Sequence, residues 1–256
     1  MAKSTENVPT VKEEAALPTT TPIVDFSADM ETGFEDADSS SYAIPFLRQL
    51  QATSGQCKKQ DPDYIKGAEE GDFYNTVTEK VYKSEDGIIV VPCHYNHKYN
   101  EWAPDRGGFR GSHDVAGYSG LTKTKLKDNK GNEYEANAET GNALQDTREH
   151  YVLIVNPDGT TEPALLCLSS TQMKKSKKWM TLMQGIRING QTAPMFSQRY
   201  KLSTVGESND KGSWAGIKIE HVGQVTSVEE YKAAKQFREM VRAGTAKAVA
   251  PDDLPY

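Results

Sequence analysis

The stretch HYVLIVN (150–156), PDGT (157–160) and EPALLCLSS (162–170) decides the fold. Two nearly continuous apolar runs stand on either side of a short segment of turn residues. Short apolar runs bounded by turn residues predict buried strands, and two such runs around a turn predict an antiparallel hairpin. The centre of the domain is therefore expected to be a sheet that is buried on both faces.

Three more hairpins are predicted outward from this one. DFYNTVTEKVY (72–82) leads through DG (86–87) into the long strand IIVVPCHYNHKY (88–99). LTKTKLK (121–127) and NEYEAN (132–137) flank DNKG (128–131). MFSQRYKLSTV (195–205) and WAGIKIEHV (214–222) surround GESNDKGS (206–213). The pattern is mostly one of strands.

Helices are predicted at a few places. YAIPFLRQLQ (42–51) is interpreted as a short helix that begins the domain. STQMKKSKKWMTLMQGI (170–186) is capped by Ser170 or Thr171, and Met173, Met180 and Met183 lie along one side. In TSVEEYKAAKQFREMVRAG (226–244), Ser227 and Glu230 form a capping box and Gly244 ends the helix. The apolar face of this last helix is formed by Val228, Tyr231, Phe237 and Val241.

These elements predict a mainly β fold, a small closed or half-closed barrel with inserted hairpins and two helices. Residues 1–40 are rich in Thr, Glu, Pro and Ser, which predicts a disordered acidic N-terminal arm. Residues 41–243 are expected to form the folded domain, with its C-terminal helix at 227–243. Residues 244–256 are expected to be a flexible acidic C-terminal tail.

Charge is distributed unevenly along the 256 residues. The net charge is −6, and 36% of the residues are hydrophobic. Residues 1–40 contain two lysines and nine acidic residues, and the tail 244–256 carries −1, so the charge of residues 41–243 is +2. The N-terminus does not have the pattern of a secretory signal, and no apolar run is long enough to span a membrane. Three irregularly spaced cysteines fit a reducing cytoplasm.

The window between Glu162 and Glu207 lacks acidic side chains. Lysine and arginine release counterions from a phosphate backbone, and aromatic rings provide faces on which unpaired bases stack. The window therefore favours nucleic-acid binding, although a solvated helix face with core aromatics would give the same residues. The candidate contacts are Lys174, Lys175, Lys177, Lys178, Trp179, Arg187, Arg199, Tyr200 and Lys201, with Phe196 as a further ring.

The segment CHYNHKYNEWAPDRGGFRGSH (93–113) is a second candidate. Its buried strand continues into exposed rings and then into a glycine-rich loop with arginines, an arrangement that suits a groove for single strands. A strand end followed by a surface loop is the alternative interpretation. The candidate contacts are Tyr95, Tyr99, Trp102, Arg106, Phe109 and Arg110, and His97 shares the face of the two tyrosines.

Other motifs carry less weight. Lys123, Lys125 and Lys127 face Glu133 and Glu135 in their hairpin, so cross-strand pairing neutralises them. Cys93, His94 and His97 do not have the spacing of a zinc site, and we expect no metal or other cofactor. Phosphate-loop and hydrolase signatures are also missing, so the sequence predicts a protein that is not an enzyme.

The chain ends in DDLPY, which resembles the C-terminal tip of bacterial and phage single-stranded-DNA-binding proteins. Asp252, Asp253, Leu254, Pro255 and Tyr256 match it, with Tyr in place of the usual Phe and with fewer acids. The segment GDFYNTVT…IIVVPCHYNHKYNEW is also similar to a stretch in phage proteins assigned this role. The resemblance implies an OB-type barrel, sequence-independent single-strand binding and recruitment of replication and recombination proteins through the tail.

The sequence is thus interpreted as a phage-type single-stranded-DNA-binding protein that acts in replication, recombination and repair. Two alternatives stay open: a β-rich virion or assembly protein, and a DNA-processing nuclease. The expected partners are single-stranded DNA and replication proteins, without a membrane. The sequence leaves the oligomeric state open, with a homo-oligomer as one option.

Overall fold

A computed structural model describes residues 32–33, 36, 43–104, 108–210, 212–246 and 248. The chain divides into two units, Met1–Ala37 and Asp38–Tyr256. In the first unit only Thr32, Gly33 and Asp36 are described, all in turns. The second unit carries all the helices and strands that follow. None of the helices in the described part of the chain is long and apolar enough to cross a membrane.

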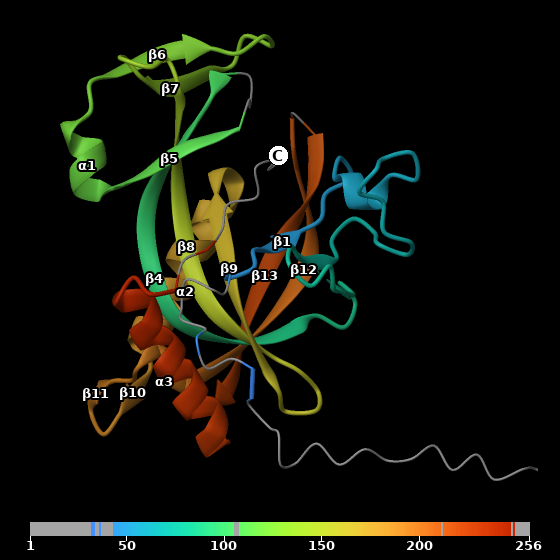
Figure 1. Cartoon of the computed structure of the whole chain (residues 1–256), viewed down its shortest axis with the longest axis vertical. Helices are drawn as coiled ribbons and strands as arrows, with labels where there is room; N and C mark the ends of the chain where they lie inside the picture. The colour runs from blue at the N-terminus through green and yellow to red at the C-terminus, as the bar shows by residue number, and fades with distance from the viewer. Residues whose placement is uncertain are drawn as a thin grey trace, which may run out of the picture. The chain divides into compact units, whose positions relative to one another are not determined.

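One large antiparallel sheet dominates the second unit (Figure 1). Its path runs β13 (Gly212–Gln224), β12 (Gln198–Asn209), β4 (Ile88–Trp102), β8 (Ala143–Val155), β7 (Glu133–Asn137) and β6 (Lys123–Lys127). Two strands lie off this path, since β5 (Phe109–Asp114) pairs with β4 and β9 (Thr161–Ser169) pairs with β8. The predicted mainly β fold is confirmed, as are the hairpins β6–β7, β8–β9 and β12–β13.

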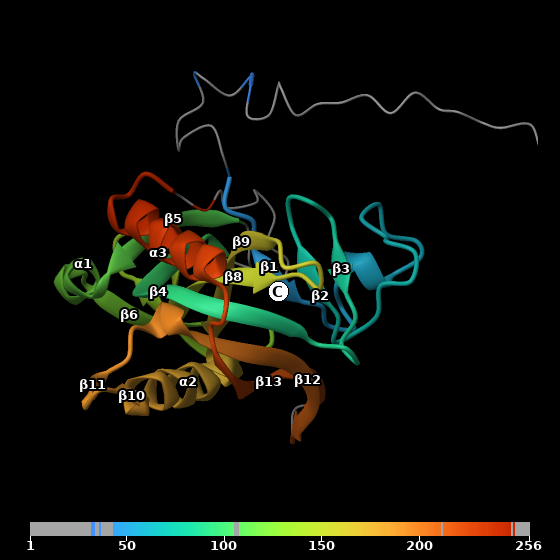
Figure 2. The ribbon, with the colours of Figure 1, turned by 90° about the horizontal axis from the view of Figure 1, so that it is seen from below.

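The two long helices cover opposite sides of this sheet (Figure 2). Trp179 and Met183 of α2 (Met173–Gly185) pack on a core that includes Val90, Val152 and Leu166. On the other side, α3 (Val228–Arg242) packs on a second core. That core contains Val91, Cys93, Leu153, Leu165, Ala234, Phe237 and Val241. Because β4 and β8 are buried on both faces here, their sequences are continuously apolar.

The remaining elements are short. A three-stranded sheet contains β1 (Leu47–Gln49), β2 (Phe73–Asn75) and β3 (Val81–Tyr82), and β10 (Arg187–Ile188) pairs with β11 (Gln191–Thr192). Helix α1 (Val115–Gly120) connects β5 to β6, and single 3-10 turns occupy η2 (Gly55–Cys57), η4 (Ser170–Gln172) and η5 (Met195–Ser197).

Glutamine side chains connect the β13 edge of the large sheet to the segment of β1 and to η4. The described strands do not close by backbone pairing, because β13 pairs only with β12. Instead, Gln51 accepts a hydrogen bond from the Ala215 N–H and donates one to the Ala215 carbonyl, both at 3.0 Å. Gln172 accepts from Ile217 N–H at 3.3 Å, and Gln49 donates to Gly216 O at 3.2 Å. These contacts hold the edge of β13 against β1 and η4; we call them the glutamine seam.

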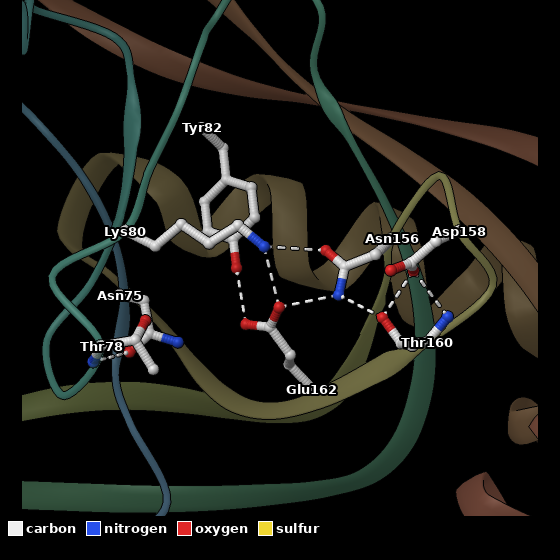
Figure 3. Close-up of polar contacts among 8 residues, drawn as sticks. All are labelled: Asn75, Thr78, Lys80, Tyr82, Asn156, Asp158, Thr160 and Glu162. Atoms are coloured by element: carbon white, nitrogen blue, oxygen red, sulfur yellow. Dashed lines mark hydrogen bonds and ion pairs between the residues drawn. The ribbon is translucent and has the colours of Figure 1, made fainter. Parts of the chain in front are cut away.

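A polar network attaches the three-stranded sheet to the β8–β9 turn (Figure 3). Lys80 donates to Glu162 at 2.8 Å and to Asn156 at 2.9 Å. The Tyr82 hydroxyl donates to the other oxygen of Glu162 at 2.9 Å, and Asn156 donates to Glu162 at 2.7 Å. Because Glu162 collects three donors, it fixes β3 against the turn that the sequence predicted at 157–160.

Three of the predicted local structures are wrong. The described part of the segment 42–51, residues 43–51, contains no helix, and Leu47–Gln49 pairs with β2 where a short helix was expected. The segment 72–82 is itself a hairpin, β2–β3, and β4 pairs instead with β12, β5 and β8. Neither Ser170 nor Thr171 caps α2, since both belong to η4 and the helix begins after Gln172 without a side-chain cap.

The C-terminal helix is largely as predicted. Ser227 accepts the N–H of Glu230, and Gly244 follows the helix in the left-handed conformation at φ +70°. Two residues of its predicted apolar face differ, because Val228 and Tyr231 are exposed. The chain after it is not all tail: Ala246 is buried in the α3 core and Ala248 bridges to Ile44. Lys247 and residues 249–256 of the predicted tail, and nearly all of the predicted arm, lie outside the described residues.

Candidate nucleic-acid interface

A groove of about 750 Å³ lies on the α3 side of the sheet, beyond the C-terminal end of that helix. It runs along β1, β9, the C-terminal half of β4 and the N-terminal half of β8. It ends at η4 and at Trp214 of β13. In its lining, carboxamides and hydroxyls are the prevailing polar groups. The carboxamides are Gln49, Gln51, Gln56, Asn96, Asn100, Gln145 and Gln172, and the hydroxyls come from Ser54, Ser112, Thr147, Tyr151, Ser169, Ser170 and Thr171.

Alternate residues of the paired strands β4 and β8 form one wall of the groove. Asn96, Lys98, Asn100 and Trp102 extend from β4, and Gln145, Thr147, Glu149 and Tyr151 extend from β8. In the register of the pair, Asn96 is opposite Glu149 and Asn100 is opposite Gln145. The sequence analysis did not identify this face, although its polar residues recur with a period of two. The rings at positions 95, 97 and 99 indicated the opposite face of the strand instead.

Two of the predicted rings belong to the groove. Trp102 and Phe109 both line it and meet edge to face, with ring centroids 5.5 Å apart. The indole N–H of Trp102 donates to Gln145 at 3.2 Å, which fixes the ring in the wall, and Trp102 is 6% exposed. Phe109 is half-buried and Trp214 is a further half-buried ring at the other end. Phe109 and Trp214 therefore have the exposure that stacking on a base requires.

Positive charge continues from the groove onto α2. Arg48 and Lys98 line the groove, and its only carboxylate among the described lining residues is Glu149. The groove ends at Thr171 and Gln172, immediately before α2 begins. Lys174, Lys177 and Lys178 are exposed on that helix, and their contact with phosphate stays a prediction.

Two predicted contacts are core residues. Trp179 and Tyr200 are both 0% exposed and lie edge to face in the α2 core, so neither ring offers a face to a base in this structure. Trp179 stacks on His150 with ring centroids 4.6 Å apart. Burial lowers the pKa of His150 to about 3, and its Nε2 lies 2.7 Å from the Ser176 hydroxyl. For these two rings, the interpretation as core aromatics is correct.

The predicted cations separate into several groups. Lys175 forms an ion pair with Glu207, and Arg199 forms one with the buried Glu230. Lys201 is half-buried on β12, whereas Arg187 is exposed in the β10–β11 hairpin and Arg110 is exposed on β5. Arg106 lies outside the described residues. A window without acidic residues in the sequence is thus not a surface without acidic residues. Glu207 and Glu230 lie at or beyond the end of this window but contact its cations in the folded structure.

The tyrosines of β4 lie on the opposite side of the sheet from the groove. The Tyr95 hydroxyl accepts from Arg148 at 3.1 Å, and its ring is 5.2 Å from His150. Tyr99 stacks nearly parallel on Tyr118 of α1, with centroids 3.5 Å apart, and the Lys123 ammonium lies 4.5 Å from the Tyr118 ring centroid. These rings form a second aromatic surface that the structure does not join to the groove.

A buried carboxylate organises the end of β4 next to the groove. Burial alone would raise the pKa of Glu101, yet the group accepts from Thr140 at 2.7 Å and from Asn142 at 2.8 Å, and lies 2.7 Å from His113 Nε2. These contacts lower its pKa to about 2. Glu101 is therefore an anion that ties β4 to β5 and to the β7–β8 turn, beside Trp102.

Two sequence expectations concern metals and the tail. In the described part of the chain, no group of three or more His, Cys, Asp or Glu side chains could hold a metal ion. Asp252, Asp253, Leu254, Pro255 and Tyr256 all lie outside the described residues. Their proposed role as a partner-binding tail stays a prediction.

A sequence model of the Pam3 phage gp34-like protein family matches residues 12–247. The chain belongs to the Pam3 phage gp34-like protein family. The match includes every helix and strand of the sheet and every described residue of the groove except Ala248. A phage protein was predicted from the sequence, and family membership confirms that part of the prediction. No curated protein and no solved structure matches the chain.

Proposed function

We propose that this member of the Pam3 phage gp34-like protein family binds single-stranded DNA through the groove. The observation that carries the proposal is the lining itself: rings, carboxamides, hydroxyls and two cations against one carboxylate. Unpaired bases have both faces and edges to satisfy, and this lining offers a partner for each. Duplex DNA presents only the edges of its bases, in the major and minor grooves of the double helix. It therefore fits poorly into a recess between the strands of a protein sheet.

In this proposal the phosphates follow the cations. Arg48 and Lys98 neutralise the backbone within the groove, and Lys174, Lys177 and Lys178 extend its path along α2. The curved sheet would act as an OB-like barrel whose last joint is the glutamine seam. The protein would not be an enzyme, and in the host cytoplasm it would coat DNA during replication, recombination and repair. The C-terminal tail would recruit partner proteins.

A titration tests the proposal directly. The full chain is mixed with labelled oligo-dT, with a duplex of equal length and with the RNA equivalent, at several salt concentrations. We expect single strands to bind well and duplex poorly, with the logarithm of affinity falling by about 0.7 per phosphate contact against the logarithm of salt.

Four results would contradict the proposal. Equal affinity for duplex or a flat salt dependence would exclude this mode of binding. Absence of any affinity for single strands would favour the alternative of a virion or assembly protein. Metal-dependent degradation of the labelled strand would favour the alternative of a nuclease.

A further inference from the structure

Glu149 stands at the centre of the groove wall. It lies on β8 between Thr147 and Tyr151, and strand register places it opposite Asn96 of β4 and Cys167 of β9. Among the described lining residues it is the only acidic side chain. A carboxylate in a groove proposed to bind DNA repels the phosphates and weakens their binding. We therefore expect this carboxylate to bind a ligand group other than phosphate.

The carboxyl group of Glu149 is only weakly satisfied by the protein. Asn96 donates to its Oε2 at 3.4 Å and the Tyr151 hydroxyl donates to the same oxygen at 3.5 Å. Both distances are at the upper limit for a hydrogen bond, whereas charge-assisted bonds are normally near 2.8 Å. Burial raises the pKa of Glu149, as expected for a carboxyl group removed from water without strong donors. The oxygens therefore retain acceptor capacity toward a ligand.

The chemistry of the bases decides which ligand group fits. Cytosine presents an amino group at N4, and carboxylates accept hydrogen bonds from that group. Uracil and thymine present the O4 carbonyl at the same position, and an oxygen facing a carboxylate oxygen is repelled. The groove wall around Glu149 is otherwise built of carboxamides, which serve both kinds of edge because they donate and accept.

We propose that Glu149 makes the groove selective for bases with an exocyclic amino group, cytosine above all, over uracil and thymine. This selectivity rests on the proposed function, since it assumes that unpaired bases enter the groove. Glu149 is then a specificity-determining residue, and binding that is indifferent to sequence elsewhere along the strand has a preference at this one position.

The experiment compares oligo-dC with oligo-dU of 15 nucleotides, which differ only in the edge presented by the base. Affinities of the full chain are measured by fluorescence anisotropy at pH 7.5 and fixed salt. We expect the wild type to bind oligo-dC about fivefold more tightly, a single base contact's worth of discrimination. Glu149→Gln and Glu149→Leu should bring the ratio close to one. Both should bind oligo-dU more tightly than the wild type, because the charge is gone.

Glu133→Gln is the matched control. Glu133 is an exposed carboxylate on β7 outside the groove lining, so this variant changes the net charge equally and should keep the wild-type ratio. Thermal melting verifies that all variants fold. Equal affinity of the wild type for the two oligonucleotides, or an unchanged ratio in both Glu149 variants, would overturn the inference while leaving single-strand binding in place. Loss of binding to both oligonucleotides in the wild type would overturn the proposed function itself.

Discussion

Glu101 shows how one residue can hold several segments together. Glu101 is 6% exposed, and its side chain joins His113 of β5 to Thr140 and Asn142 of the β7–β8 turn, two separate parts of the chain. Nothing in the segment around it distinguishes Glu101 from an ordinary strand residue, because its partners are brought together only by the pairing of β4 with β5 and β8.

Acid should remove the stabilising contribution of Glu101. Its folded-state pKa is about 2, below the ordinary value of 4.5, so the stabilisation is complete above pH 4.5 and is lost as the pH falls toward 2. At pH 7, Glu101→Gln should lower the free energy of unfolding by about 1–3 kcal/mol. The difference from the wild type should shrink in the acid range. Urea titrations at pH 7, 4.5 and 3 measure this, with Glu133→Gln as control; a constant difference at all three pH values would contradict it.

At the scale of elements, the glutamine seam closes a gap that backbone pairing leaves open. Gln51→Ala leaves the buried Ala215 N–H without its partner, which should cost about 1–3 kcal/mol. Gln172→Ala should cost less, because its contacts are 3.3 and 3.5 Å long. Since both glutamines donate to the same Ala215 carbonyl, their effects should not add.

Thermal unfolding of the two single variants and the double variant gives the coupling energy of the seam. Gln191→Ala, at an exposed position of β11, is the neutral control. Strict additivity of the two glutamine variants would mean that the seam does not act as one unit.

Helix α2 has two faces with opposite expected behaviour. Lys177→Ala combined with Lys178→Ala should leave the free energy of unfolding within about 0.5 kcal/mol of the wild type. It should also weaken single-strand binding and reduce the salt slope by up to about 1.4. Trp179→Ala removes a fully buried ring and should cost about 3–5 kcal/mol of stability. Anisotropy titrations over a salt series and urea unfolding separate the two effects; a stable Trp179→Ala variant with weak DNA binding would contradict this assignment.

The sequence predicts elements better than it predicts the site, and the reason is physical. Apolar runs such as 150–156 report burial, which is a local property, so the hairpin they predict is present. Lys174, Lys177 and Lys178 of α2 are exposed as expected. Glu207 and Glu230 reach Lys175 and Arg199 only through tertiary pairing. Trp179 and Phe109 look alike in sequence, and only packing decides that one is core and the other lines a groove.

For the whole molecule, the point at which the domain ends is a testable boundary. Removing residues 250–256 retains Ala246 in its core and Ala248 beside Ile44, so folding should be unchanged. Single-strand affinity should be equal or tighter, and pull-down of replication partners should be lost. Removing 245–256 takes away the buried Ala246 as well, together with the N–H groups of Thr245 and Ala246 that bond to the Met240 carbonyl, and should lower the melting temperature.

Circular dichroism melts, anisotropy titrations and partner pull-downs on the two truncated proteins make this comparison. Clearly weaker DNA binding after removal of only 250–256 would place the tail in the DNA site and end the recruitment hypothesis.

The glutamine seam also bears on how the chain is made. Gln51 lies 164 residues before Ala215, and Gln49 lies 167 residues before Gly216. At about 5–20 residues per second, a ribosome needs roughly 10–30 s between synthesising the first side of the seam and the second. During that interval Gln49 and Gln51 lack their backbone partners in β13, and the sheet lacks its edge strand. The nascent chain therefore cannot fix β1 in its final position until β13, the last strand, has been synthesised.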